Sequence, residues 1–267
     1  MSQILKNNYK FKLENHNFWL HRLKNYKEKL VCTKDIILDK LEEDQIVKNI
    51  IKKSSILELG CGNGLMPAKL SKKKKIKNYL GTDFVKELVD NCKSKFSSKN
   101  IKFKVLDMTL INQSTFSEKF DYIISKRAIQ NILSHRLQLR IIDNAGYYLK
   151  KNGLMILVES SAIAQKNIND LRKKYNLSKI IPPFHNLFFD DNKIKKYNFK
   201  NVKLLKIDNF SSNFYFISRI IYALYAKNFL KKNPVYNHFL NIIASTVKEN
   251  LLSKDLSQIK TFFFKKI

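Results

Sequence analysis

The sequence of 267 residues is poor in cysteine, proline, glycine and acidic side chains. Its three cysteines, Cys32, Cys61 and Cys92, are widely spaced and form no C-x-x-C pair, which argues against a disulfide framework or a zinc ribbon. So few thiols fit a reducing compartment, and we expect a cytoplasmic location. No proline- or glycine-rich linker divides the chain, whose length suits one elaborated α/β domain or at most two small domains.

Long apolar runs are also lacking. The most apolar helical stretch, residues 214–226, is too short to cross a bilayer and contains Arg219. The first 12 residues alternate apolar and polar side chains without a signal-peptide core. We therefore expect no transmembrane segment, while the hydrophobic share of 44% is enough for a large core.

The scarcity of acids leaves a large positive charge. Lys and Arg number 51 against 22 Asp and Glu, a formal net charge of +29. Most of this charge is lysine, whereas phosphate and base recognition favours arginine. Because Lys, Asn and Ile share A/T-rich codons, a biased base composition also produces this pattern. We expect a solvated lysine surface; attraction to RNA, an anionic membrane surface or a phosphorylated substrate is the alternative.

From residue 56 onward, short apolar runs alternate with amphipathic stretches. The runs predict strands at residues 56–59, 78–82, 101–106, 120–125, 154–159, 202–207 and 261–265. This alternation predicts an α/β fold with a doubly wound, seven-stranded and mainly parallel sheet. Residues 1–53 are expected to form an N-terminal helical extension. Residues 54–267 form the main domain, with a largely helical insertion at 214–252 before the last strand.

A glycine-rich turn follows the first predicted strand and precedes a helix. It reads Glu58-Leu59-Gly60-Cys61-Gly62-Asn63-Gly64. Glycine accepts positive φ and lets a ligand approach the backbone, and ligands of open α/β sheets bind at the carboxyl ends of the strands. A dinucleotide fingerprint needs glycine at position 65, where the chain has Leu65, so NAD and FAD are less favoured. No Gly-Lys-Ser/Thr follows, which excludes a phosphate loop.

The stretch ILELGCGNG (56–64) resembles the first motif of the class I S-adenosylmethionine (SAM) methyltransferases, and further motifs follow in order. FDYIIS (120–125) and LKKNGLMILVES (149–160) are similar to the family's fourth- and fifth-strand motifs. The resemblance implies a Rossmann-like SAM-binding domain in which Asp83 binds the ribose hydroxyls and Asp107 the adenine amine. The implied cofactor-binding residues are Glu58, Gly60, Cys61, Gly62, Asn63, Gly64, Asp83, Phe84, Asp107 and Met108. Asp83 can also cap the helix that follows it.

The second half is similar to a narrower group of bacterial methyltransferases that are often associated with surface-polysaccharide or other small-molecule pathways. Residues 125–132 match that group's fourth-strand exit at Arg127 and Asn131, while Lys126 departs from it. Residues 168–172, 184–188 and 214–219 resemble its later segments. The resemblance implies a substrate pocket of Arg127, Asn131, Asn169, Arg172, His185 and Asn186, and catalytic roles for His185, Arg127 and Glu159.

The spacing of these residues suits a polar pocket. Arg127 and Asn131 are four residues apart and share a helical face. Arginine can hold a carboxylate or phosphate, and His185 can take a proton from a hydroxyl or amine. The alternatives are structural: a buried ion pair between Arg127 and Glu159, and a hydrogen bond that holds His185 in place. Lid and substrate-side elements are expected within residues 182–252.

We predict a SAM-dependent methyltransferase that acts without a metal on an O or N atom of a small polar acceptor, such as a sugar or glycan precursor. The protein mainly aligns donor and acceptor. One alternative is an RNA methyltransferase, but no Asn/Asp-Pro-Pro-Tyr/Phe motif ends the fourth strand and no cysteine follows a proline. Another is a non-catalytic SAM-fold partner subunit, against which the intact glycine loop and both acids argue.

Overall fold

A computed structural model describes residues 3–51, 53–73, 75–247 and 254–267. The expected helical residues 248–252 lie outside the described residues. No helix within the described ranges has the length and apolarity needed to cross a membrane.

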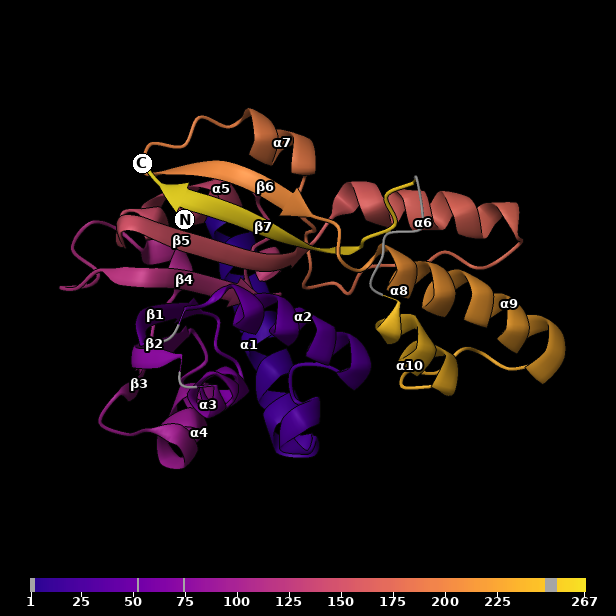
Figure 1. The fold of residues 1–267 in the computed structure, drawn as a ribbon, viewed down its shortest axis with the longest axis horizontal. Coiled ribbons are helices and arrows are strands. Elements are labelled where there is room, and N and C mark those ends of the chain that lie inside the picture. The colour runs from indigo at the N-terminus through magenta and orange to yellow at the C-terminus, as the bar shows by residue number, and fades with distance from the viewer. Residues whose placement is uncertain (1–2, 52, 74, 248–253) are drawn as a thin grey trace.

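A seven-stranded sheet with the order β3-β2-β1-β4-β5-β7-β6 forms the centre of the molecule (Figure 1). β7 runs antiparallel to both β5 and β6, and the other neighbouring pairs are parallel. The predicted sheet is therefore confirmed. The strands are β1 (Ser54–Leu59), β2 (Ile76–Asp83), β3 (Ile101–Val105), β4 (Phe120–Lys126), β5 (Leu149–Ser160), β6 (Val202–Asp208) and β7 (Ile259–Lys266).

The central strands are apolar on both faces, as buried parallel strands are. Neighbouring residues of a strand point to opposite faces. Ile56 and Ile124 accordingly belong to one hydrophobic core, while Leu57 and Ile123 belong to a second core on the other side of the sheet. Helices cover both faces, which gives the layered architecture that the alternating pattern predicts (Figure 1).

β5 begins earlier than its apolar run indicates. Its pairing with β4 passes from Leu149 to Leu154, so residues 150–153 form an irregular start to the strand. Lys150 Nζ lies 3.1 Å from Asp121 Oδ1, and this ion pair holds the polar residues beside β4.

Helices occupy three parts of the chain. The N-terminal part has α1 (Gln3–Asn25), the 3-10 turn η1 (Glu28–Leu30) and α2 (Ile36–Asn49). The connections between strands carry α3 (Leu65–Lys72), α4 (Lys86–Phe96), η2 (Met108–Leu110), η3 (Ile129–Asn131), α5 (His135–Gly146), α6 (Ala162–Lys174) and α7 (Asp191–Lys196). The insertion between β6 and β7 has α8 (Ser212–Phe216), η4 (Ile217–Ile221), α9 (Tyr222–Tyr225), η5 (Ala226–Leu230) and α10 (Phe239–Thr246).

The order of strands reverses direction at β1, since β2 lies on one side of it and β4 on the other. In doubly wound sheets the crevice outside the carboxyl ends of such strands is where ligands bind. The glycine turn after β1 and the residues that end β2, β3 and β4 therefore meet at this edge.

Candidate functional site

The glycine turn after β1 needs glycine for reasons visible in its geometry. Gly60, Gly62 and Gly64 have φ values of +74°, +51° and +71°, a region that L-residues with side chains rarely adopt. A Cβ on Gly60 would lie 2.2 Å from Ala128 Cβ, so a side chain would collide with the exit of β4. The N–H groups of Gly60 and Cys61 both donate to the carbonyl of Thr82 at 2.8 Å. The turn is thus fastened between the ends of β2 and β4.

Asp83 braces this turn from the end of β2. Its Oδ2 accepts a 3.0 Å hydrogen bond from the Gly62 N–H, and its Oδ1 accepts one of 3.0 Å from the Val85 N–H. Burial raises the pKa of the Asp83 carboxyl, while these backbone N–H groups act in the opposite direction. Each carboxylate oxygen can accept more than one hydrogen bond, so the bracing role and the predicted ribose contact are compatible.

Asp107 and Met108 follow β3. Because β3 and β2 lie on the same side of β1 in the sheet, these residues are on the same side of the glycine turn as Asp83. The Asp107 Oδ1 accepts hydrogen bonds from the Thr109 N–H and Oγ1, and its Oδ2 lies 2.5 Å from Lys12 Nζ. Burial by itself raises the pKa of Asp107, but the hydrogen bonds from Lys12 and Thr109 lower it further than burial raises it, so the pKa lies below its ordinary value. Met108 Cε lies 3.6 Å from where a Cβ on Gly60 would be. The adenine-side pair of the sequence prediction therefore lies next to the glycine turn.

The N-terminal segment covers this edge, which sequence analysis missed. Besides the Lys12 ion pair, His16 on α1 lies 3.2 Å from Glu87 at the start of α4, and its ring contacts Phe84 at 6.4 Å between centroids. Asn63 of the glycine turn donates to the Glu28 carbonyl at 2.8 Å. The available signal was the four-residue spacing of Lys12 and His16, which places both on one face of α1.

Glu58 and Cys61 lie deeper in the fold. Glu58 is buried and accepts a hydrogen bond from the Tyr79 hydroxyl, and burial raises its pKa to about 7. Cys61 is also buried, and a hydrogen bond with Cys92 together with burial raises its pKa well above the usual value. These contacts give Glu58 a role in holding β1 and β2 beneath the turn and keep the Cys61 thiol protonated.

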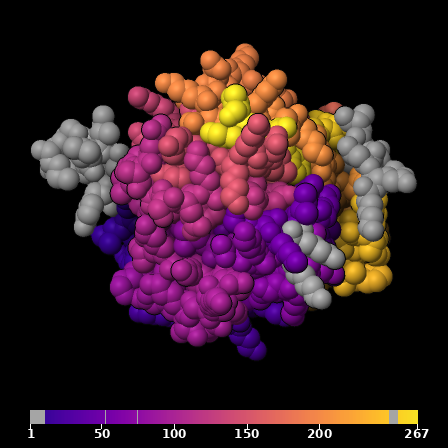
Figure 2. Space-filling view, turned by 60° about the vertical axis from the view of Figure 1, so that its left-hand side comes forward, coloured from indigo at the N-terminus to yellow at the C-terminus, as the bar shows by residue number. Residues whose placement is uncertain are grey.

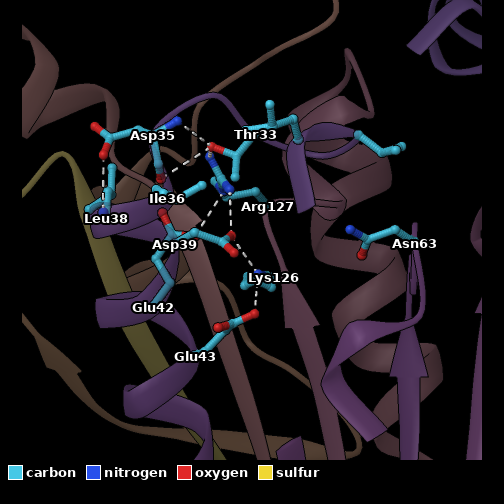
Figure 3. A network of polar contacts seen from close by, with 12 residues as sticks. Thr33, Asp35, Ile36, Leu38, Asp39, Glu42, Glu43, Asn63, Lys126 and Arg127 are labelled. Atoms are coloured by element: carbon cyan, nitrogen blue, oxygen red, sulfur yellow. Dashed lines mark hydrogen bonds and ion pairs between the residues drawn. The ribbon is translucent and has the colours of Figure 1, made fainter. Parts of the chain in front are cut away.

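Arg127 follows β4 and is bound to the acidic face of α2 (Figure 3). It has a φ of +54°. Its Nε lies 3.0 Å from Glu42 Oε2 and its Nη2 lies 3.1 Å from Asp39 Oδ1. The neighbouring Lys126 also pairs with Asp39, at 2.6 Å. Burial opposes the charge of Arg127, but Glu42 and Asp39 raise its pKa above the ordinary value.

Glu159 does not pair with Arg127, contrary to the structural alternative considered above. Its Oε1 accepts hydrogen bonds from Ser125 Oγ at 2.8 Å and from the N–H groups of Ala128 and Ile129, and its Oε2 accepts from Gln130 N–H. Burial raises its pKa to about 7 against these donors. Glu159 thus fastens the η3 turn that carries the residues after β4, and its predicted catalytic role stays a prediction.

A cleft of about 350 Å³ opens beside this turn. Four of the predicted substrate residues line it: Arg127, Asn131, His185 and Asn186. Asn131 Nδ2 donates to Asn186 Oδ1 at 3.0 Å, which joins the two segments. Tyr215, Arg219 and Tyr236 of the wall lie within the expected substrate-side region 182–252, whereas Phe18, Trp19, Arg22 and Cys32 come from the N-terminal extension, which sequence analysis had not assigned to a site.

Asn169 and Arg172 do not line the cleft. The Asn169 side chain donates to the Ile180 carbonyl at 3.1 Å and accepts from the Ile180 N–H at 2.9 Å. Arg172 Nε donates to the Ser178 carbonyl at 2.7 Å, and Nη1 donates to the Arg219 carbonyl. Both side chains hold the segment that forms the wall, so their predicted substrate contact has no counterpart in this cleft.

His185 lies in an aromatic part of the cleft and is only 6% exposed. Its ring is 4.3 Å from the Phe18 ring and 5.6 Å from the Trp19 ring, centroid to centroid. Burial, with Arg22 nearby, lowers its pKa to about 4. Its Nδ1 has no hydrogen-bond partner among the described residues. A neutral imidazole with an unpartnered nitrogen is suited to a polar group of a ligand.

Three arginines and Lys34 line the cleft, together with the acidic Asp35. Arg219 pairs with Asp35 at 2.6 Å, and Arg127 pairs with α2. Arg22 instead donates to the carbonyls of Leu30 and Val31.

The described residues contain no group of three or more His, Cys, Asp and Glu side chains that could hold a metal ion. Metal independence stays a prediction.

Comparison with known proteins identifies the fold and the family. Residues 50–201 match a family described as "Methyltransferase domain". A chain of the Haloferax volcanii complex between the Trm112 methyltransferase activator and a methyltransferase is 12% identical, with a TM-score of 0.61 and coverage of 93% of this chain and 96% of that one. Among curated proteins, no significant match was found.

Two further solved structures share the fold over nearly the whole chain. The N-methyltransferase NodS of Bradyrhizobium japonicum, in complex with S-adenosyl-L-homocysteine, is 10% identical with a TM-score of 0.53, covering 94% of this chain and 98% of that one. The magnesium protoporphyrin IX methyltransferase of Synechocystis is also 10% identical, with a TM-score of 0.54 and full coverage of both chains.

Proposed function

The chain belongs to the methyltransferase domain family and uses SAM as its cofactor, and we propose that it methylates an O or N atom of a small polar acceptor. A sugar or glycan precursor is the acceptor class that the sequence favours. We further propose that residues 1–53 and the elements within 182–252 supply the substrate side. Contributions of both to the wall of the cleft support this division. The three free cysteines support a cytoplasmic location.

The residues at the strand ends fit SAM. Three glycines with positive φ provide a backbone that a ligand can approach closely. Asp83 and Asp107, one strand apart, are carboxylates that can accept hydrogen bonds from ribose hydroxyls and from an amine, and Met108 adds an apolar side chain. When bound, SAM supplies a methyl group activated by its sulfonium charge.

One observation carries the proposal: the cleft adjoins the glycine turn. Arg127 lines the cleft, while the next residue, Ala128, lies against Gly60. Cys32 also touches both, since it lines the cleft and would meet a Cβ on Gly62 at 2.6 Å. A molecule in the cleft would therefore face the turn. A volume of about 350 Å³ is that of a small-molecule site, which favours a small acceptor over an RNA strand.

The residues of the cleft suit an acceptor that must be oriented more than activated. Phe18 and Trp19 exclude water from one side. A His185 with a pKa of about 4 is a weak base at neutral pH, so it orients a hydroxyl or a neutral amine through its unpartnered nitrogen. Arg22 and Arg127 can hold polar or anionic oxygens of the acceptor.

The test has two steps. Calorimetric titration of the purified protein with S-adenosylhomocysteine, with NADH as a control, should show binding of the first compound alone. A screen for transfer of the labelled methyl group should then favour sugars and sugar nucleotides over RNA. Methylation of RNA alone would replace the proposed acceptor class, and binding without transfer to any acceptor would favour the non-catalytic subunit.

A further inference from the structure

The insertion between β6 and β7 presents an apolar surface to solvent. Of the 21 large apolar side chains that are exposed in the described residues, nine lie within residues 221–243. Phe229 is 75% exposed, Phe239 66% and Val235 60%. α9 and α10 project beyond the end of the sheet (Figure 1), and the gold-coloured part of the insertion forms one margin of the space-filling view (Figure 2). We call residues 221–243 the insertion surface.

The exposed side chains of this surface gather on connected faces. Ile221, Tyr225 and Phe229 are four residues apart, so they follow one side of the helical segment, and the rings of Tyr225 and Phe229 stack at 5.6 Å between centroids. The ring of Tyr222 stacks on that of His238 at 4.2 Å, which holds the start of α10 against α9. This contact joins the two segments that carry the exposed apolar residues.

The charge of this region has one sign. Residues 209–247 contain no Asp or Glu, whereas Arg219, Lys227, Lys231 and Lys232 are basic. Arg219 pairs with Asp35 of the N-terminal part. Lys227, Lys231 and Lys232 are exposed and stand beside Phe229 in the chain. An apolar surface bordered by lysines without any acid is typical of helices that lie in a membrane interface.

We propose that the insertion surface docks on the surface of an anionic lipid bilayer. Phe229, Val235 and Phe239 would enter the headgroup region, and the three lysines would contact anionic headgroups. A symmetric contact with a second copy is less favoured, because it would bring the lysines of the two copies together without a compensating acid on the segment. The proposal goes beyond methyl transfer and does not depend on it.

Docking would also orient the cleft. Tyr236 belongs to the insertion surface and lines the cleft, and a further residue of the wall, Ile181, is 82% exposed. Because the apolar surface reaches the mouth of the cleft, a docked molecule would turn that mouth towards the bilayer. An acceptor held in the interface would then reach the cleft without leaving the membrane.

The test is sedimentation of the full chain with vesicles of phosphatidylcholine alone and of phosphatidylcholine mixed with phosphatidylglycerol. We expect binding to the mixed vesicles and little to the neutral ones. Phe229→Glu should weaken binding at least ~10-fold, because it removes an aromatic ring that enters the headgroup region on docking and adds a charge that anionic headgroups repel. Ile51→Glu, which alters an equally exposed apolar residue elsewhere (71%), is the matched control and should bind like the wild type.

A second pair of variants tests the electrostatic part. Lys231→Ala/Lys232→Ala should lower binding by roughly 30-fold, at ~1 kcal/mol for each lysine near the surface. Lys102→Ala/Lys104→Ala, which removes two exposed lysines from β3, should have a smaller effect. If circular dichroism shows that Phe229→Glu does not fold, Phe239→Glu takes its place.

Three results would overturn the proposal. They are failure of the folded wild type to bind mixed vesicles, equal loss of binding in the insertion and control variants, and a wild-type dimer that Phe229→Glu dissociates. The last would identify the surface as a contact between copies. Calorimetry with S-adenosylhomocysteine on the same variants reports separately on the proposed function and should be unchanged.

Discussion

Arg127 Nε lies 3.0 Å from Glu42 Oε2, which ties the residue after the fourth strand to the second N-terminal helix. Glu42 is fully buried, and apart from this ion pair its oxygens have no hydrogen-bond partner among the described residues. Burial raises its pKa to about 7, although Arg127 acts in the opposite direction. The N-terminal helices are therefore part of the site, and an ionisable group in their interface with the sheet responds to pH.

The first prediction concerns the pH dependence of Glu42. Its carboxyl titrates near 7 in the folded protein and near 4.5 in the unfolded chain. The folded state thus binds more protons between these values, and stability falls as pH rises through this window. Glu42→Gln should have nearly wild-type stability at pH 5 and be more stable by about 2 kcal/mol at pH 8.

Urea unfolding at several pH values measures this difference. Asp44→Asn, an exposed carboxyl-to-amide change on the same helix, is the matched control. Part of the pH dependence should persist in Glu42→Gln, because burial also raises the pKa values of Glu58 and Glu159 to about 7. Parallel stability curves for Glu42→Gln and the wild type would contradict the assignment.

The second prediction separates the structural role of Arg127 from its role in the cleft. Arg127→Ala leaves Glu42 buried without its partner and should destabilise the protein by about 3 kcal/mol at pH 8. Adding Glu42→Gln should recover part of that loss, because the unpaired acid is removed. Additive effects of the two substitutions on urea unfolding would show that the pair is not coupled.

The effect of Arg127 on turnover is then measured in the double variant Arg127→Ala/Glu42→Gln, which should be more stable than Arg127→Ala. It should bind S-adenosylhomocysteine like the wild type, and its turnover should be lower because the cleft has lost a cation. Arg136→Ala, at an exposed arginine on α5, is the control. Loss of cofactor binding in a folded Arg127 variant would assign Arg127 to the cofactor site instead.

The third prediction concerns Asp83. Asp83→Ala removes the acceptor for the Gly62 and Val85 N–H groups and the predicted ribose contact, so affinity for S-adenosylhomocysteine should fall by about 2 kcal/mol. Asp83→Asn keeps one acceptor oxygen and should lose less. Asp190→Ala is a close control, because Asp190 also accepts from two backbone N–H groups at a helix start. Equal calorimetric affinities of the wild type, Asp83→Ala and Asp83→Asn would contradict the ribose contact.

The fourth prediction concerns His185. Its pKa is about 4 in the folded protein against 6.5 normally, so its contribution to stability is present above pH 6.5 and is lost as the pH falls towards 4. His185→Phe keeps an aromatic ring without titration. Between pH 7 and pH 4.5 the wild type should lose about 2 kcal/mol relative to this variant, after allowance for the partly solvated cleft.

His185→Phe should also lower turnover and leave cofactor affinity unchanged. His21→Phe, at an exposed histidine on α1, controls for the substitution. Wild-type turnover in His185→Phe would assign the histidine to packing alone. The same pH dependence of unfolding in His185→Phe and the wild type would contradict the lowered pKa of His185.

Much of the fold could be predicted because its information is local. The strands lie where short apolar runs occur, since a strand buried on both faces requires continuous apolar residues. The error at the start of β5 has the same origin: residues 150–153 are polar, and their pairing beside β4 depends on an ion pair between Lys150 and Asp121. That contact joins residues 29 positions apart and has no signature in the run itself.

The glycine turn and the acids at the ends of β2 and β3 could be predicted from the sequence. A parallel sheet brings the carboxyl ends of its strands to one edge, whatever the packing of the helices. The partners that these residues take depend on how distant helices pack. Lys12 reaches Asp107 across 95 residues, and Arg127 reaches Asp39 across 88. Asn169 and Arg172 turn to backbone carbonyls of the cleft wall for the same reason. Periodicity specifies which side chains an element buries, and packing between elements specifies what those side chains meet.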